Sequence, residues 1–245
     1  FDHRPGIAFY TSQLARVQAN PGQKHWQLAK RVLRHLLYTP DLGVRHHRGG
    51  AGLYYYTDSS WAGVKPTCVK APDGNHRAVA GDDGRRSTYG YVGYLADGPI
   101  TWASRVHKGR LTLSTTEAEL VAATETCKEL LHNTYVAAGL GIPAPPGIPV
   151  FEDNQSALSL CPRAGITQRS KHIQARWFFC RELQGASPGE GAVHTQYKCT
   201  TDQVADIFTK RLDERTLTHL RQRLLRASED QARPPADLGL PAAVA

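Results

Sequence analysis

Acidic residues at the ends of predicted elements are the part of this sequence whose types and spacing suggest chemistry. Asp58 closes one β-rich run, Asp153 closes another, and Asp206 lies in a helical pattern near the C-terminal end. A fourth acid, Glu117 or Glu119, comes from LSTTEAEL at the start of a long helical pattern. Adjacent carboxylates repel one another unless hard cations such as Mg²⁺ hold them together. If these acids converge, we therefore expect a divalent-cation site.

Each aspartate also has a purely structural interpretation that spacing leaves open. Asp58, in TDSS, can begin an Asx turn. Asp153 can cap the helix that follows it. Asp206 precedes Lys210 by four residues, and this spacing favours a solvated ion pair on a helix surface.

The two glutamates compete for one role. Ser114 and Glu117 match a capping box, in which the serine caps the first turn and the glutamate reaches back to it. Residues two positions apart on a helix are separated by about 200°, so Glu117 and Glu119 cannot both face one site.

The elements that must position these acids follow from apolar periodicity and turn residues, which predict a mixed α/β fold. Strands are expected at residues 53–58, 90–96, 99–105, 149–153 and 191–198. Helices are expected at residues 22–43, 114–138, 154–160, 171–183 and 200–212. Asp97 and Gly98 are expected to form the turn of a hairpin. A five-stranded mixed sheet flanked by helices accommodates this order, and sites in open sheets form at strand ends.

Composition limits the classes of protein that the chain can represent. With 245 residues and 40% hydrophobic content, one main domain is expected. No run of eighteen apolar residues and no leader is readable, so we expect a soluble, intracellular protein without a membrane partner. Five widely spaced cysteines without a C-x-x-C pair argue against disulfides and zinc. The absence of methionine predicts a fragment of a longer product.

Charge favours a polyanionic partner. The chain has 30 Lys+Arg against 22 Asp+Glu, a net charge of +8. Seven basic residues in loops or at element ends are the candidates for binding phosphates: Arg85, Arg86, Arg105, Lys108, Arg110, Arg169 and Lys171.

Several motifs, in order, resemble the ribonuclease H domain of copia-type LTR retrotransposon Pol polyproteins: YYTDSSWAG, GRRSTYGYVGYL, ITWASR, LSTTEAELVAATE, EDNQSALSL, RSKHIQARWFFCREL and TTDQVADIFTKRL. The upstream segment is similar to the region that joins the family's reverse transcriptase to its ribonuclease H. The resemblance implies a ribonuclease H-like domain at residues 50–226. It also implies the C-terminal end of the reverse transcriptase, or connection segment, at residues 1–49. Residues 227–245 are expected to be disordered.

The resemblance assigns four catalytic and metal-binding acids. Asp58 matches the first-strand T/S-D motif, Glu119 the second glutamate of T-E-A-E, Asp153 the aspartate of D-N-Q-S-A, and Asp206 that of A-D-I-F-T-K. Two Mg²⁺ ions, or Mn²⁺ in their place, would then support hydrolysis of the RNA strand of an RNA–DNA hybrid. The remaining polyprotein would be a further partner, and the setting would be cytoplasmic or nuclear, including virus-like particles.

Two other functions stay open on sequence grounds. Ser60 stands where the family commonly has an acid, and residues 64–81 lengthen a normally short loop. The chain can therefore also be interpreted as a catalytically silent retrotransposon remnant that folds and binds nucleic acid. A structural spacer of a polyprotein is the third interpretation.

Overall fold

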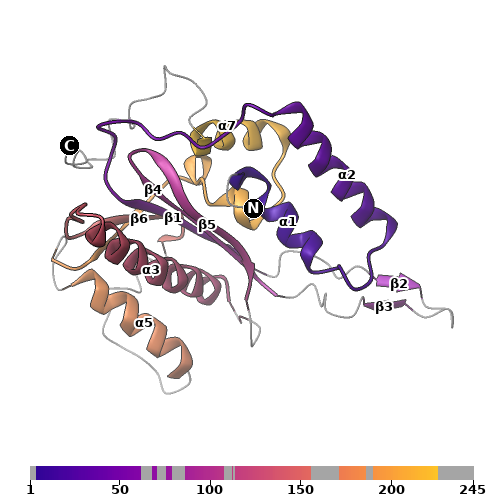
Figure 1. The fold of residues 1–245 in the computed structure, drawn as a ribbon. Helices are drawn as coiled ribbons and strands as arrows, with labels where there is room; N and C mark the ends of the chain where they lie inside the picture. Colours follow the sequence, from indigo (N-terminus) through magenta and orange to yellow (C-terminus); the bar gives the residue numbers. More distant parts are fainter. Residues whose placement is uncertain are drawn as a thin grey trace.

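A five-stranded mixed sheet forms the centre of the protein, for which we describe a computed structural model (Figure 1). The structure describes residues 4–61, 68–70, 76–78, 86–107, 112, 114–155, 171–185 and 190–225. The strands are β1 (Tyr54–Ser60), β4 (Thr88–Leu95), β5 (Gly98–Val106), β6 (Ile148–Glu152) and β7 (Val193–Tyr197). Their order is β5-β4-β1-β6-β7, with β1 antiparallel to β4 and parallel to β6. The predicted five-stranded mixed sheet is thus confirmed.

Helices cover both faces of this sheet (Figure 1). On one face lie α3 (Thr115–Gly139) and α5 (Lys171–Gln184), both close to their predicted bounds. On the other lie α1 (Ala8–Ala15), α6 (Asp206–Thr209) and α7 (Glu214–Leu225). None of the helices in the described ranges is long and apolar enough to cross a membrane.

The alternation of side chains along β1 divides the core into two layers. Tyr55 packs in a cluster with Leu130 of α3 and Trp177 of α5. Tyr54 and Tyr56, on either side of it, pack in a cluster with residues of α6 and α7. Successive strand residues point to opposite faces, so the three consecutive tyrosines supply both layers.

The hairpin between β4 and β5 turns one residue earlier than predicted. Ala96 and Asp97 have φ values of 51° and 59°, as both central residues of a type I′ turn require. Gly98 is instead the first residue of β5. A Cβ at Gly98 would lie 2.3 Å from the carbonyl oxygen of Arg45, so this glycine is required for a close backbone approach.

The N-terminal helices add a unit that the sequence predicted only in part. The 3₁₀ turn η1 (Pro5–Ile7) and α1 were not anticipated, whereas α2 (Gln23–Tyr38) was. Helix α1 contacts β5 and α6, while α2 contacts α1 and lies farther from the sheet (Figure 1). Trp26 and Leu33 of α2 remain 57% and 58% exposed. The apolar spacing predicted the helix correctly. It also predicted that this side of the helix would be buried, whereas these two side chains are exposed.

Two predictions are wrong in their secondary structure. Within residues 64–81, which were expected to lengthen a loop, β2 (Cys68–Lys70) and β3 (His76–Ala78) form a two-stranded antiparallel sheet. Strands of three residues are too short to produce a recognisable alternation. The predicted helix at 200–212 is broken into η3 (Thr200–Asp202) and α6.

Some predictions fall outside the described residues. They include most of the helix expected at 154–160 and the tail after residue 226. The proposed boundary at residue 50 remains a prediction. The cysteines with described side chains, Cys127, Cys180 and Cys199, form no disulfide bonds.

Candidate metal centre

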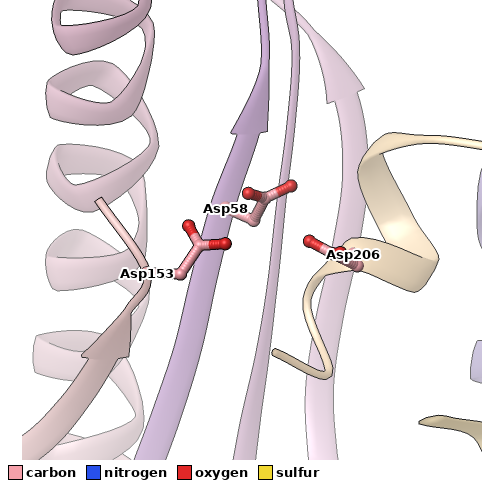
Figure 2. A group of neighbouring side chains, drawn as sticks. All are labelled: Asp58, Asp153 and Asp206. Atoms are coloured by element: carbon pink, nitrogen blue, oxygen red, sulfur yellow. The ribbon is translucent and has the colours of Figure 1, made fainter. Parts of the chain in front are cut away.

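Three aspartates converge at one end of β1 and β6. Tyr56 of β1 pairs with Phe151 of β6, and Asp58 and Asp153 each follow two residues later. In neighbouring parallel strands, residues at matching positions lie side by side on the same face. Asp206 begins α6, which contacts β1 and β4 on that face. The three side chains point toward one another, and one carboxylate oxygen of each lies within 4.8 Å of the others (Figure 2).

A lysine forms ion pairs with two of these carboxylates. Lys210 Nζ lies 2.8 Å from Asp206 Oδ1 and 3.8 Å from Asp58 Oδ2. The spacing predicted the first of these ion pairs, but not its environment. Asp206 is only 4% exposed, so the solvated pair expected from spacing is wrong. It is instead a buried component of the acid cluster, because α6 packs directly on the sheet.

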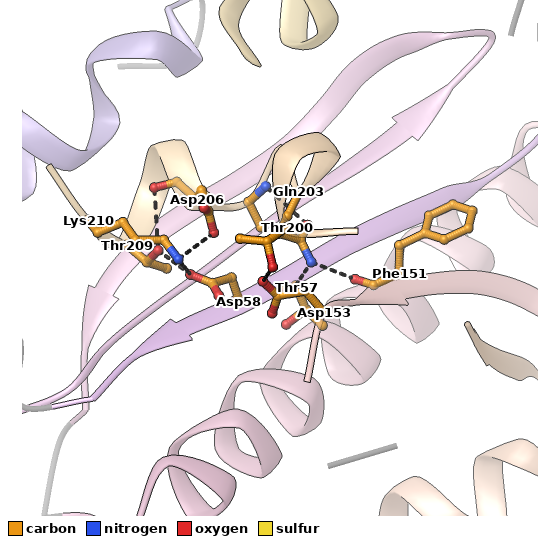
Figure 3. A network of polar contacts seen from close by, with 10 residues as sticks. Thr57, Asp58, Phe151, Asp153, Thr200, Gln203, Asp206, Thr209 and Lys210 are labelled. Atoms are coloured by element: carbon orange, nitrogen blue, oxygen red, sulfur yellow. Dashed lines mark hydrogen bonds and ion pairs between the residues drawn. The ribbon is translucent and has the colours of Figure 1, made fainter. Parts of the chain in front are cut away.

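Hydroxyl groups of the segment 200–210 orient Asp58 and Asp153 (Figure 3). Thr209 Oγ1 donates a hydrogen bond to Asp58 Oδ2. Thr200 Oγ1 donates to Asp153 Oδ2 at 2.8 Å. These threonines were not among the predicted site residues. Their roles depend on a break in the expected helix, which brings both ends of the segment to the sheet.

Burial and mutual repulsion make the site electrostatically unfavourable for bare carboxylates. Burial raises the pKa of Asp58, against the opposing charge of Lys210. Burial and the charge of Asp58 raise the pKa of Asp206 to about 7. Burial acts to lower the pKa of Lys210, but the charges of Asp58 and Asp206 outweigh it and raise that pKa. The cluster therefore favours a bound positive charge.

Glu119 reaches the same cavity from the opposite layer. A cavity of about 490 Å³ is lined by Glu119, Asp58, Asp153 and Lys210, among others. Glu119 is only 6% exposed, and its Oε2 atom has no hydrogen-bond partner among the described residues. Its pKa is raised to about 11 by burial and by the charges of Glu152, Asp58 and Asp153. Because α3 covers the other face of the sheet, Glu119 does not join the three aspartates within 4.8 Å.

Glu117 has the position expected for a capping residue. Its backbone N–H donates to Ser114 Oγ at 3.1 Å, so the serine caps α3 as predicted. Glu117 is not among the residues that line the cavity. The two glutamates thus differ in environment, as the 200° between them requires.

Glu152 is a buried acid that the sequence analysis missed. It is 2% exposed at the end of β6 and lies beside Glu119. Burial, followed by the charges of Asp58 and Asp153, raises its pKa well above the usual range. Alternation in VFED could have predicted this burial, because Glu152 shares one face of the strand with the apolar Val150.

Few of the predicted phosphate-binding residues can be placed. Arg85, Lys108, Arg110 and Arg169 lie outside the described residues. Lys171 is the first residue of α5, and only its backbone is described. Arg86 lies two residues before β4, and Arg105 is the second-last residue of β5. Both residues are exposed. Nucleic-acid binding by these residues stays a prediction.

The strand order and the helices on both faces define a ribonuclease H-like fold, with acids gathered at the ends of its central strands. The chain is 32% identical over 210 residues to a retrovirus-related Pol polyprotein from transposon RE2 of Arabidopsis thaliana, covering 85% of this chain and 13% of the relative. It is also 32% identical over 208 residues to the Pol polyprotein from transposon TNT 1-94 of Nicotiana tabacum, covering 84% and 14%. The chain belongs to the family of copia-type retrotransposon Pol polyproteins, as its motifs indicated.

The chain spans only about an eighth of the length of these relatives. Among solved structures, it is similar to ribonuclease H1 from the archaeon Halobacterium salinarum, with 16% identity and a TM-score of 0.40. That similarity covers 64% of this chain and 93% of the archaeal one. No family model matches the chain.

Proposed function

We propose that the chain is a ribonuclease H, which hydrolyses the RNA strand of RNA–DNA hybrids with two divalent metal ions. The observation that carries this proposal is the group formed by Asp58, Asp153 and Asp206, whose carboxylate oxygens lie within 4.8 Å of one another on a ribonuclease H-like fold. Membership of the Pol family supports it, because the motifs of this chain resemble the ribonuclease H domain of that family. On the same grounds we propose that residues 50–226 form the hydrolase domain and residues 1–49 the end of the reverse transcriptase.

The residues present fit hard divalent cations. Carboxylate oxygens are the ligands that Mg²⁺ and Mn²⁺ prefer, and the cluster contains no thiolate or imidazole that would favour softer metals. Burial, together with neighbouring carboxylates, raises the pKa values of Asp58 and Asp206, and a bound cation would offset both effects by stabilising the charged carboxylates. When bound, two such ions supply activation of water and stabilisation of the leaving oxygen.

The side chains have separable roles in this proposal. Asp58, Asp153 and Asp206 hold the cations, and Glu119 adds a ligand from the α3 side through its unpartnered Oε2 atom. Thr200 and Thr209 keep Asp153 and Asp58 oriented toward the cluster. Asp58 lies on β1 and Asp153 directly follows β6, so the sheet organises these two ligands before any metal binds.

The net charge of the chain and the lining of the cavity favour a nucleic-acid substrate. A net charge of +8 favours a polyanion, and the cavity lined by Asp58, Glu119 and Asp153 would receive a phosphate of its backbone. The 2′-hydroxyl distinguishes the RNA strand from the DNA strand chemically. The remainder of the polyprotein would deliver the hybrid to this site.

A cleavage assay tests the proposal. With labelled RNA annealed to DNA, we expect shortened RNA in Mg²⁺ and none in EDTA. Asp153→Asn should abolish cleavage because it removes a ligand charge while preserving volume. Asp202→Asn is the matched control, since Asp202 pairs with Arg223 at the surface and lies outside the cavity. Hybrid binding without cleavage would instead support the catalytically silent remnant.

A further inference from the structure

Gln203 is a fully buried polar residue at the point where the expected C-terminal helix breaks. Its backbone, at φ −76° and ψ 93°, is extended between η3 and α6. Its side chain is 0% exposed, although glutamine is usually found at the surface. Such a side chain is tolerated inside a protein only when its polar atoms are hydrogen-bonded.

The hydrogen bonds of Gln203 join the two strands that carry the candidate ligands (Figure 3). Its Nε2 atom donates to the carbonyl oxygen of Thr57 on β1 at 3.0 Å. The same atom lies 3.4 Å from the carbonyl oxygen of Phe151 on β6, a longer second hydrogen bond. Thr57 immediately precedes Asp58, and Phe151 lies two residues before Asp153.

The hydrogen bonds of Gln203 lie where the pairing between β1 and β6 ends. The recorded pairs between β1 and β6 are Tyr55 with Val150 and Tyr56 with Phe151, and no later pair occurs among the described residues. Backbone hydrogen bonds hold paired strands about 4.8 Å apart. At the end of this pairing, the amide of Gln203 links Thr57, the next residue of β1, to Phe151, the β6 member of the last pair.

We propose that Gln203 is a positioning residue, whose side-chain amide sets the separation of β1 and β6 at the end of their pairing and thereby the distance between the carboxylates of Asp58 and Asp153. This inference rests on the proposed function, because it concerns the geometry of the cation site. Mg²⁺ demands near-ideal octahedral geometry, so a small change in ligand separation lowers its affinity.

A merely structural role makes a different prediction. Removing the amide leaves two buried carbonyl oxygens without that donor, which destabilises the fold whatever the role of Gln203. Stability alone therefore does not distinguish the two roles. The affinity of the folded protein for Mg²⁺ does, because it depends on ligand spacing rather than on the free energy of unfolding.

The experiment compares three variants with the parent by calorimetric titration of Mg²⁺ into the metal-free chain, at a temperature where circular dichroism shows each to be folded. Gln203→Met preserves approximate volume and removes both donors. Gln203→Asn retains an amide that is one methylene too short to reach both strands. Thr126→Val is the matched control, since Thr126 is also fully buried and donates to the Thr57 hydroxyl rather than to the backbone junction.

We expect the Mg²⁺ dissociation constant to rise at least tenfold in Gln203→Met and less in Gln203→Asn, with Thr126→Val close to the parent. If Gln203→Met does not fold, a weakened affinity in Gln203→Asn supports the inference and an unchanged one overturns it. Parent-like affinity in Gln203→Met, or an equal loss in Thr126→Val, also overturns it. If the parent binds no Mg²⁺, the proposed function itself fails and the inference falls with it.

Discussion

At the scale of single residues, Lys210 has a role that a metal ion can also fill. Its ammonium group lies within 4 Å of both Asp58 and Asp206 and supplies positive charge to a cluster of buried acids. Removing one partner of a buried ion pair leaves an uncompensated charge. Lys210 therefore stabilises the metal-free protein specifically, and its contribution should fall when a cation occupies the site.

Lys210→Met should consequently lower the stability of the metal-free protein. We expect a loss on the order of 1 kcal/mol, less than for a fully buried pair because the lysine side chain is 37% exposed. Excess Mg²⁺ should recover most of this loss by binding the folded state. Thermal melts in EDTA and in Mg²⁺ measure both effects. Lys128→Met, which breaks a surface pair with Glu125, is the control and should change little. A Lys210→Met protein that melts with the parent in EDTA would contradict this role.

The pKa of Asp206 predicts how metal-free stability depends on pH. Its pKa is about 7 in the folded protein against 3.8 for the ordinary side chain, so the folded state binds the proton more tightly. The stabilisation is fully present below the ordinary value and is lost as pH rises through about 7. The contribution of Asp206 to the melting temperature in EDTA should therefore fall from about pH 4 upward, and the last part of this fall should lie between pH 6.5 and 8.

A comparison with Asp206→Asn isolates this contribution. His107, whose pKa burial lowers to about 4, acts in the opposite direction at lower pH but is present in both proteins. Asp206→Asn should show a flatter profile between pH 6.5 and 8, because it has no carboxylate to deprotonate. Parallel profiles for the two proteins would show that Asp206 does not titrate in this range.

At the scale of secondary-structure elements, the close packing of α6 on β4 positions Asp206. Gly90 of β4 pairs with Asp58, and a Cβ at Gly90 would lie 2.5 Å from Phe208 Cβ. Gly90→Ala should displace α6 and destabilise the fold by about 1–3 kcal/mol, the usual cost of overpacking. Gly139→Ala is a suitable control, since a Cβ there meets nothing within 4 Å. Urea unfolding provides the measurement, and a Gly90→Ala midpoint equal to that of the parent would argue against this packing constraint.

The same elements show what periodicity could and could not predict. Strand and helix positions follow from apolar alternation, and the Ser114 cap follows from its local pattern, so the sheet and α3 were predictable. The break at Gln203 was not, because its cause is a pair of hydrogen bonds to strands far away in the sequence. The burial of Asp206 was missed for the same reason, since i,i+4 spacing contains no information about tertiary packing.

At the scale of the whole molecule, the basic balance predicts a salt-dependent interaction with hybrids. Neutralising phosphates releases counterions, so the logarithm of affinity should fall with the logarithm of salt concentration by about 0.9 per contact on B-form DNA. Arg105→Ala should reduce this slope, because Arg105 is exposed at the end of β5. Lys128→Met, whose charge is already paired, should not. Fluorescence anisotropy over a salt series gives the slopes, and salt-independent binding would show that the basic excess has no part in recognition.

The proposed function requires Asp58, Asp153 and Asp206 to form a divalent-cation site. Diffraction from crystals soaked in Mn²⁺, which scatters anomalously and takes the same oxygen ligands as Mg²⁺, tests it most directly. We predict anomalous peaks at about 2.0–2.2 Å from oxygens of all three aspartates, close to the distance for Mg²⁺. A map without such peaks, in which Lys210 remains paired with Asp206 at saturating Mn²⁺, would contradict the claim.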